Sequence, residues 1–227
     1  MTYTGGPLYA DRAEAGRVLA SRLRGFSGDP DAIILALPRG GVPVGFEISR
    51  QLNLPLDVMI VRKLGVPGQE ELAMGAIASG NVVVLNRVLI RQLRIAEEDI
   101  QRIIERERIQ VNREEEDFRG WRPAAEVRNR TVIVVDDGLA TGSTMEAAAQ
   151  TIRARAPKNL ILAVPVGPVE SCARLRGQAD QMICSATPSG FSSVGAFYRV
   201  FNQTTDEEVR SLLEQSKNLG GSIRRTA

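Results

Sequence analysis

Histidine is absent from the 227 residues of this sequence, and cysteine and aromatic residues are scarce. Without histidine the chain cannot build a Ser-His-Asp triad, a Cys-His pair, a histidine-ligated metal site or an imidazole acid–base catalyst. The two cysteines, Cys172 and Cys184, form no Cys-x-x-Cys pair and cannot supply a four-thiolate zinc site. We therefore interpret them as free thiols of a reducing compartment, and not as a disulfide or a reactive site.

Long apolar runs and a strong net charge are missing too. No run of 18 apolar residues occurs, which argues against a transmembrane helix. The first seven residues lack the basic and apolar regions of an export signal. Lys and Arg number 29 against 27 Asp and Glu, and a net charge of +2 is too small to predict nucleic-acid binding. We expect a cytoplasmic protein with no membrane or nucleic-acid partner.

Short apolar runs alternate with helical patterns along the chain. The runs that indicate buried strands cover 32–37, 56–61, 131–135 and 160–166, with shorter strands expected at 82–85 and 181–186. Helices are predicted from Asp11 to Leu23 and over 42–52, 145–155, 169–175 and 206–215. This order predicts one α/β domain over residues 1–227, with a central parallel sheet flanked by helices and a polar, frayed tail at 216–227.

A long charged segment at about 87–119 interrupts this alternation. Its pattern is helical, with Ile100, Ile103, Ile104 and Val111 on one face. Between residues 94 and 119 it carries six arginines and nine acidic residues, which does not suit a phosphate-binding helix. We interpret it as an inserted helical segment with a salt-bridged, solvated outer face. A dimer contact or a lid over a site is the alternative, and we expect a homodimer.

The segment from Val132 to Thr144 carries the clearest functional signal. A buried strand brings Asp136 and Asp137 to its carboxyl end, and a loop rich in glycine and hydroxyls then leads into a helix. Backbone N–H groups of residues 140–144 at a helix N-terminus would form a phosphate site. The two carboxylates before it can take vicinal sugar hydroxyls, or Mg²⁺ directly or through water. Ordinary turn and N-cap chemistry is the alternative, but a ribose 5-phosphate fits the whole arrangement.

This string of apolar residues, two acids and a Thr-Gly-x-Thr loop resembles the phosphoribosyl diphosphate (PRPP) motif of type I phosphoribosyltransferases. Residues 37–41, Leu-Pro-Arg-Gly-Gly, lie where that family places its pyrophosphate loop. Arg62 and Lys63 follow the next strand, where family members carry basic residues for the diphosphate. Segments 9–12, 71–76, 194–198 and 205–209 are similar to a bacterial subgroup of unassigned acceptor. The resemblance covers nearly all of residues 9–215.

The resemblance implies a type I phosphoribosyltransferase fold, magnesium as cofactor and a role for each motif residue. Asp136 and Asp137 would hold the ribose hydroxyls with Mg²⁺ nearby, and Arg39, Lys63 and Asp137 would be the catalytic residues. The implied PRPP contacts are Arg39, Gly40, Gly41, Arg62, Lys63, Asp136, Asp137, Gly138, Ala140, Thr141, Gly142, Ser143 and Thr144. The family often has a non-proline cis peptide at the loop, here near Pro38-Arg39-Gly40. An oxocarbenium-like transition state with a departing pyrophosphate needs positioning and charge, not histidine.

The acceptor is less well defined by the sequence. Relatives that act on 6-oxopurines carry aspartate where this chain has Ala140, whereas adenine- and orotate-type relatives carry a small residue there. The family holds its acceptor under a hood, here expected from the N-terminal segment and about 185–205. The candidates to stack on a planar base are Phe191, Phe197, Tyr198 and Phe201, and the alternative is that they pack the hood's own core. Glu70 or Glu71, on an expected mobile loop hinged at 65–68, is the candidate general base.

The resulting hypothesis is transfer of phosphoribose from PRPP to a nitrogen of a small purine- or pyrimidine-like base, with release of pyrophosphate, in nucleotide salvage or related metabolism. A non-catalytic sensor of PRPP or a nucleotide is the alternative. Arg39, Arg62 and Lys63 favour turnover, because a sensor of the 5-phosphate alone needs no grip on a leaving group. A hydrolase or a pyrophosphokinase-like activity on the same site ranks below both, since nothing marks a second nucleotide site.

Overall fold

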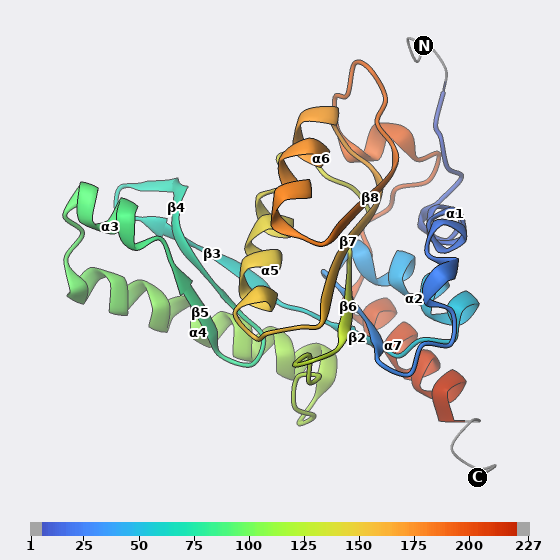
Figure 1. The fold of residues 1–227 in the computed structure, drawn as a ribbon, viewed down its shortest axis with the longest axis horizontal. Helices are drawn as coiled ribbons and strands as arrows, with labels where there is room; N and C mark the ends of the chain where they lie inside the picture. The colour runs from blue at the N-terminus through green and yellow to red at the C-terminus, as the bar shows by residue number, and fades with distance from the viewer. Residues whose placement is uncertain (1–5, 222–227) are drawn as a thin grey trace.

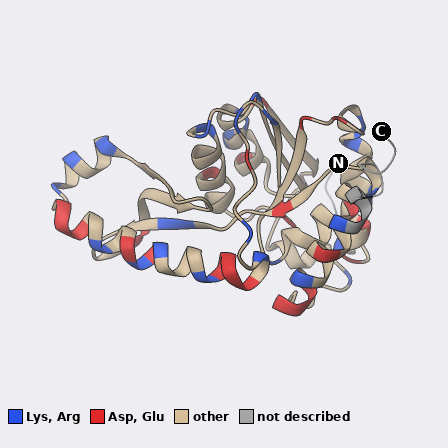
Figure 2. Cartoon of the chain, turned by 90° about the horizontal axis from the view of Figure 1, so that it is seen from below, with Lys and Arg blue, Asp and Glu red and all other residues tan. Residues whose placement is uncertain are grey.

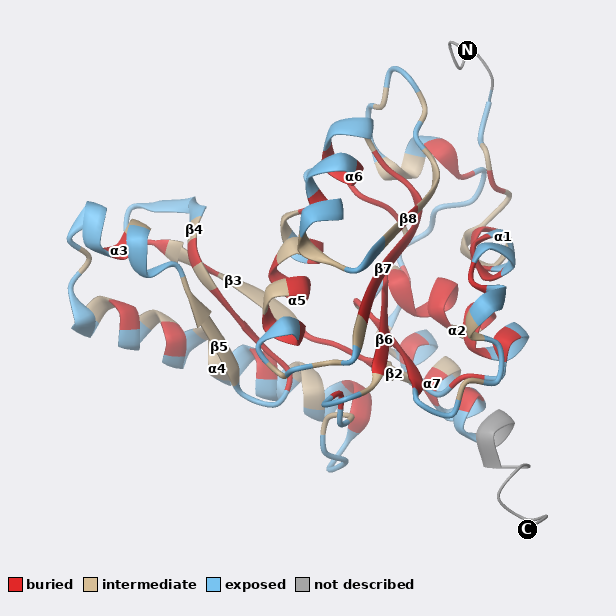
Figure 3. Ribbon diagram, in the orientation of Figure 1, coloured by how far each residue is buried: buried red, intermediate tan, exposed pale blue. Residues whose placement is uncertain are grey.

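A five-stranded parallel sheet forms the centre of the computed structural model, which describes residues 6–221 (Figure 1). Across the sheet the strands are β2 (Leu56–Val58), β1 (Ala32–Ala36), β6 (Thr131–Val135), β7 (Asn159–Val166) and β8 (Gln181–Ala186). Every residue of β1 and β6 is buried, as expected of apolar strands covered on both faces (Figure 3). The predicted α/β class, with a central parallel sheet flanked by helices, is confirmed.

Helices cover both faces of this sheet. α1 (Arg12–Arg22) and α2 (Gly41–Leu52) pack on one face, in a core that contains Leu19, Ile48 and Ile34 of β1. α5 (Ser143–Arg153) and α6 (Val169–Leu175) pack on the other, in a core that contains Met145 and Leu35 of the same strand. α7 (Asp206–Gly221) lies against α2 and α4. Alternate side chains of β1 therefore join two separate cores.

Three antiparallel strands form an arm that extends away from the central sheet (Figure 1). They are β3 (Val61–Val66), β4 (Gln69–Ala78) and β5 (Val82–Leu85). The prediction of one strand over 56–61 is wrong, because the chain leaves the parallel sheet after Val58 and begins β3 at Val61. The segment after Lys63 is not the expected loop: residues 61–78 form a paired hairpin, which turns at Gly68 with φ +75°.

The charged segment folds as two helices beside this arm, α3 (Arg87–Leu93) and α4 (Glu97–Arg119). Arg94 separates them with a left-handed backbone, φ +54°. The predicted apolar face is confirmed, since Ile100, Ile104 and Val111 are buried in the core that contains Leu64 of β3, and Ile103 is partly buried there. Acidic and basic residues are interspersed along α4 (Figure 2).

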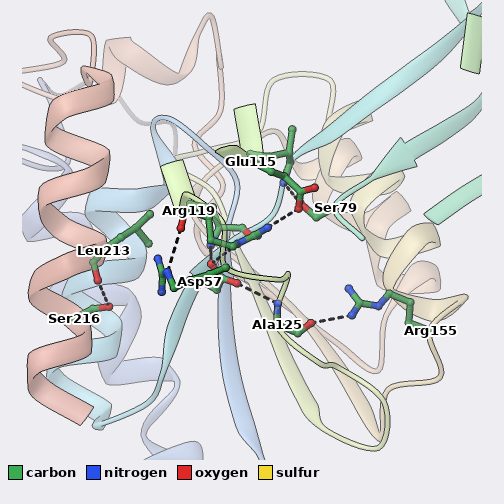
Figure 4. Close-up of polar contacts among 11 residues, drawn as sticks. Asp57, Ser79, Glu115, Arg119, Ala125, Arg155, Leu213 and Ser216 are labelled. Carbon is green, nitrogen blue, oxygen red and sulfur yellow. Dashed lines mark hydrogen bonds and ion pairs between the residues drawn. The ribbon is translucent and has the colours of Figure 1, made fainter. Parts of the chain in front are cut away.

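A buried arginine anchors the end of α4 to the central sheet (Figure 4). The Nε of Arg119 donates to Asp57 at 3.0 Å, and Nη2 donates to the carbonyl of Val58 at 2.6 Å. Its Nη1 donates to Glu115, one turn earlier on the helix. The side chain of Arg119 is only 2% exposed. These acceptors therefore offset the cost of burying the positive charge of Arg119.

The two chain ends differ from the expectation in detail. Asp11 caps α1 as predicted, its carboxylate accepting the N–H of Glu14 at 2.8 Å, but Val18 of the predicted apolar stripe is 39% exposed. α7 continues to Gly221 and buries Ser216, so the polar tail does not begin at 216. Residues 222–227 of that predicted tail lie outside the described residues.

Throughout residues 6–221, every helix is too short or too polar to cross a lipid bilayer.

Replacing Arg119 tests this anchor. Arg119→Met leaves two carboxylates without their buried partner, so we expect the free energy of unfolding to fall by about 3–5 kcal/mol. Urea denaturation measures the change. As the control, Arg102→Met removes an exposed ion pair with Asp99 on the same helix and should change stability by no more than about 0.5 kcal/mol. Equal effects of the two substitutions would contradict the anchoring role.

Candidate functional site

The site is centred on two carboxylates at the carboxyl end of β6. This strand lies between β1 and β7, so Asp136 and Asp137 lie in the middle of the sheet edge that is formed by the carboxyl ends of the strands. The backbone N–H of Asp137 donates to a carboxylate oxygen of Asp136 at 2.8 Å. Because the carboxyl ends of parallel strands share one edge, the loop that follows β1 meets this pair.

That loop, residues 38–41, lies directly on the two carboxylates. A Cβ added to Gly40 would stand 2.0 Å from Oδ2 of Asp137, and one added to Gly41 would stand 2.6 Å from the carbonyl oxygen of Val135. Only glycine permits this approach, which explains the Gly-Gly pair. The Pro38–Arg39 peptide bond is cis, as the resemblance implied.

Burial shifts the titration of both carboxyl groups. The pKa of Asp136 lies well above its usual range, first because of burial and then because of the negative charge of Asp137. Burial also raises the pKa of Asp137, but the Arg12 guanidinium opposes this rise. Arg12 donates from Nε to Oδ2 of Asp137 at 2.8 Å. The pair is therefore costly to ionise and depends on a neighbouring cation.

The expected phosphate loop, residues 140–144, lies at the N-terminus of α5. Gly142 takes φ +76° there, and the hydroxyls of Thr141 and Ser143 are 2.9 Å apart. α6 supports the loop from behind: Ser171 donates to the carbonyl of Ala140 at 3.0 Å, and Arg174 donates to that of Thr141. Residues 140, 141 and 144 of the loop are exposed. Its geometry suits an anion at the helix N-terminus.

Each of the predicted basic residues is paired with a carboxylate. Arg39 meets Asp206 of α7 at 2.7 Å. Arg62 meets Glu114 of α4 at 2.5 Å, and Lys63 lies 3.6 Å from Glu71. The sequence did not predict these pairings, because Asp206 and Glu114 lie far along the chain from Arg39 and Arg62, and it predicts Glu71 only as a candidate general base.

Two cavities divide the predicted residues between them. The first, of about 490 Å³, is lined by Arg39, Gly40, Asp137 and Arg12. The second, of about 660 Å³, is lined by Arg62, Lys63, Glu70, Glu71 and Thr144. Glu114 of α4 lines both. The structure thus brings Arg39 to the carboxylate pair and places Arg62 and Lys63 beside the phosphate loop.

The aromatic candidates form a cluster of Tyr9, Phe191, Phe197, Tyr198 and Phe201 over the same edge. The ring of Tyr198 lies 5.0 Å from that of Phe201 and 5.5 Å from that of Tyr9, and the rings of Phe191 and Phe197 lie 5.1 Å apart. Phe197 and Tyr198 are buried, and the Tyr198 hydroxyl donates to the carbonyl of Asp137 at 2.6 Å. Phe201 is the member of this cluster that lines the smaller cavity. Phe197 and Tyr198 therefore pack within the core of the hood, which is the alternative to stacking on a base.

The candidate general bases lie on the arm and not on a loop. Glu70 and Glu71 lie at the start of β4, and the Glu71 side chain is fully exposed apart from its contact with Lys63.

Gly138 packs beneath the aromatic cluster, since a Cβ there would stand 2.6 Å from Val194. A side chain larger than glycine at 138 would push the cluster away from the sheet edge.

The donor set at the sheet edge fits magnesium that arrives with a substrate. Within residues 6–221, no group of three or more histidine, cysteine or acidic side chains is arranged to hold a metal alone. Asp136 and Asp137 supply hard carboxylate oxygens, and Mg²⁺ usually binds through one or two carboxylates plus substrate phosphates and water. These two residues would hold the ion.

Arg12 is the site residue that the sequence motifs did not reveal. It lies 125 positions before Asp137, in a segment noted only for its similarity to a bacterial subgroup. Its position directly after the N-cap Asp11 indicates a helix start and gives no sign of a contact with the carboxylate pair. Only the folding of α1 against the sheet edge brings the two side chains together.

Comparison with known proteins gives a family. Residues 8–188 match the phosphoribosyl transferase domain model. Two proteins of Mycobacterium tuberculosis, strains CDC 1551 and H37Rv, with provisional phosphoribosyl transferase names, are each 45% identical over 209 residues. These matches cover 92% of this chain and 47% of theirs, so the chain spans about half the length of the curated relatives it matches. The crystal structure of TT1426 from Thermus thermophilus is similar with a TM-score of 0.83 and 38% identity, covering 91% of this chain and 98% of that one. Together with the carboxylate pair and its glycine loop, these matches show that the chain belongs to the phosphoribosyl transferase domain family.

Proposed function

We propose that this domain transfers the phosphoribosyl group of PRPP to a nitrogen of a small base and releases pyrophosphate. The observation that carries the proposal is the contact of the 38–41 loop with the carboxylate pair, beside the exposed 140–144 loop on the same edge. A diphosphate, a ribose and a 5-phosphate would lie in that order along this edge. A base as acceptor, a salvage role and a cytoplasmic location belong to the same proposal.

In this mechanism the chain's residues bind and orient PRPP. Asp136 and Asp137 accept hydrogen bonds from the ribose 2- and 3-hydroxyls, and the backbone N–H groups of 140–144 bind the 5-phosphate. The N–H groups of Gly40 and Gly41 and the side chain of Arg39 bind the pyrophosphate. Bound magnesium would add positive charge against the leaving group. The bond between the anomeric carbon and the pyrophosphate oxygen breaks, and its electron pair leaves with pyrophosphate, while the fixed carboxylates stabilise the positive charge that develops on the ribose. The nitrogen of the base forms the new bond to the anomeric carbon.

The basic residues would exchange partners on binding. Arg39 is held by Asp206 and Arg62 by Glu114, so a diphosphate must replace or join these carboxylates. Lys63 lines a third cavity, of about 410 Å³, with Ser143 at the start of α5. We propose that Arg62 and Lys63 add charge from this side, and that the cavity of about 490 Å³ lined by Phe201 leads to the acceptor.

Pyrophosphate release from Mg·PRPP is the direct test. We expect release that depends on one base from a pool of purines, pyrimidines and pyridines, measured by a coupled pyrophosphate assay. Release without any base would indicate hydrolysis. PRPP binding by calorimetry without release would favour the sensor hypothesis, and the absence of binding would overturn the proposal.

Asp137→Asn tests the ribose contact. The substitution keeps the size of the side chain and removes its charge, so we expect Mg·PRPP binding to weaken by about 1–3 kcal/mol. Isothermal titration calorimetry measures this change. As the control, Asp31→Asn alters an exposed residue ahead of β1, away from the site, and should leave the affinity as it was. An unchanged affinity for Asp137→Asn would remove this residue from the site.

Arg39→Ala tests the leaving-group contact. Because Arg39 lies by the pyrophosphate loop and not by the 140–144 loop, we expect turnover to fall at least about tenfold while ribose 5-phosphate binds nearly as before. Steady-state rates and calorimetry provide the two numbers. Equal losses in both would argue against a role at the leaving group.

A further inference from the structure

The guanidinium of Arg12 is fixed on three sides. Its Nε donates to Oδ2 of Asp137 at 2.8 Å, and its Nη1 donates to the carbonyl of Asn202 at 2.7 Å. The Cζ atom lies 3.9 Å from the centre of the Phe201 ring, which is a cation–π contact. The side chains of Arg12 and Asp137 are only 13% and 14% exposed. The three contacts leave the guanidinium little freedom to rotate.

Asp137 is fixed in turn by three separate parts of the chain. Arg12 of α1 binds its Oδ2, and the same oxygen lies 2.0 Å from the place that a Cβ of residue 40 would take. The hydroxyl of Tyr198 binds its backbone carbonyl at 2.6 Å. α1, the glycine loop and the aromatic cluster therefore meet at this one residue.

The segment that carries Phe201 and Asn202 is itself tied to the start of α1. The backbone N–H of Arg199 donates to the carbonyl of Tyr9, and that of Val200 donates to the carbonyl of Ala10, both at 2.9 Å. The ring of Phe201 stacks on that of Tyr198. A rigid unit of α1 and the aromatic cluster thus holds Arg12 from behind.

We infer that Arg12 is a positioning residue, which holds the Asp137 carboxylate in the orientation that binds PRPP and couples it to the aromatic cluster. The inference rests on the proposed function. Arginine suits this role because its planar group can donate from two nitrogens while its face stacks on a ring. Lysine carries the charge but cannot make all three contacts. Arg12 acts through Asp137 and not on the ligand itself.

A double-mutant cycle distinguishes an effect of Arg12 through Asp137 from a direct contact of Arg12 with the ligand. We expect Arg12→Met to raise the dissociation constant of Mg·PRPP roughly 10- to 100-fold, and Arg12→Lys to recover part of the loss. In the Asp137→Asn background, Arg12→Met should change the constant by less than about twofold, because the partner is already altered. Calorimetry measures all four constants. A full effect in that background would mean that Arg12 touches the ligand, and would overturn the inference.

Arg17→Met is the matched control. Arg17 lies on the same helix, is 47% exposed and reaches Glu47 only at 4.0 Å. We expect this variant to bind PRPP as the wild type does. If it lost affinity as Arg12→Met does, the effect would belong to α1 as a whole, and the positioning role would fail.

Amide hydrogen exchange gives a readout that needs no ligand. In Arg12→Met we expect faster exchange in 137–144 and in 199–203 together, with no change in β7. Unchanged exchange in both segments would overturn the coupling. If the wild type bound no PRPP, the proposed function would fail and the ligand-directed part of this inference with it, whereas the exchange data would still decide the coupling.

Discussion

The site depends on the burial of two adjacent carboxylates at the end of the central strand. Burial raises the pKa of both Asp136 and Asp137, and the negative charge of Asp137 raises that of Asp136 further, so the pair is costly to ionise. The neighbouring structure offsets this cost with the Asp137 N–H, which binds Asp136, and with Arg12, which binds Asp137. Glycines at 40 and 41 follow from the same constraint, because the loop must approach the pair without side chains.

The basic side chains around the Asp136–Asp137 pair already form ion pairs within the protein. Arg39, Arg62 and Lys63 each face a carboxylate, and these carboxylates come from α7, α4 and β4. A polyanion would therefore exchange partners with existing ion pairs and would not enter a bare positive cleft, which favours a ligand that brings its own cation. α4, the longer helix of the charged segment, is then more than a solvated cover, because its Glu114 lines both of the cavities that divide the predicted site residues.

The relatives differ in how much of their own length matches this chain. The Thermus thermophilus chain is matched over 98% of its length, whereas the Mycobacterium tuberculosis proteins are matched over 47% of theirs. The same fold thus forms nearly all of one chain and about half of others.

The sequence by itself determined the parallel sheet, the helices on its faces and the 132–144 segment, because buried strands and helix starts leave local patterns. Of the arm it predicted only the strand at 82–85: residues 69–78 lack the alternation of a half-buried strand, and in the structure they pair with β3 and β5. Nor could it reveal the contacts of Asp137 with Arg12, or of Arg39 with Asp206. Those pairs join residues far apart in the chain, and only tertiary packing, which brings α1 and α7 to the edge of the sheet, decides which charges meet.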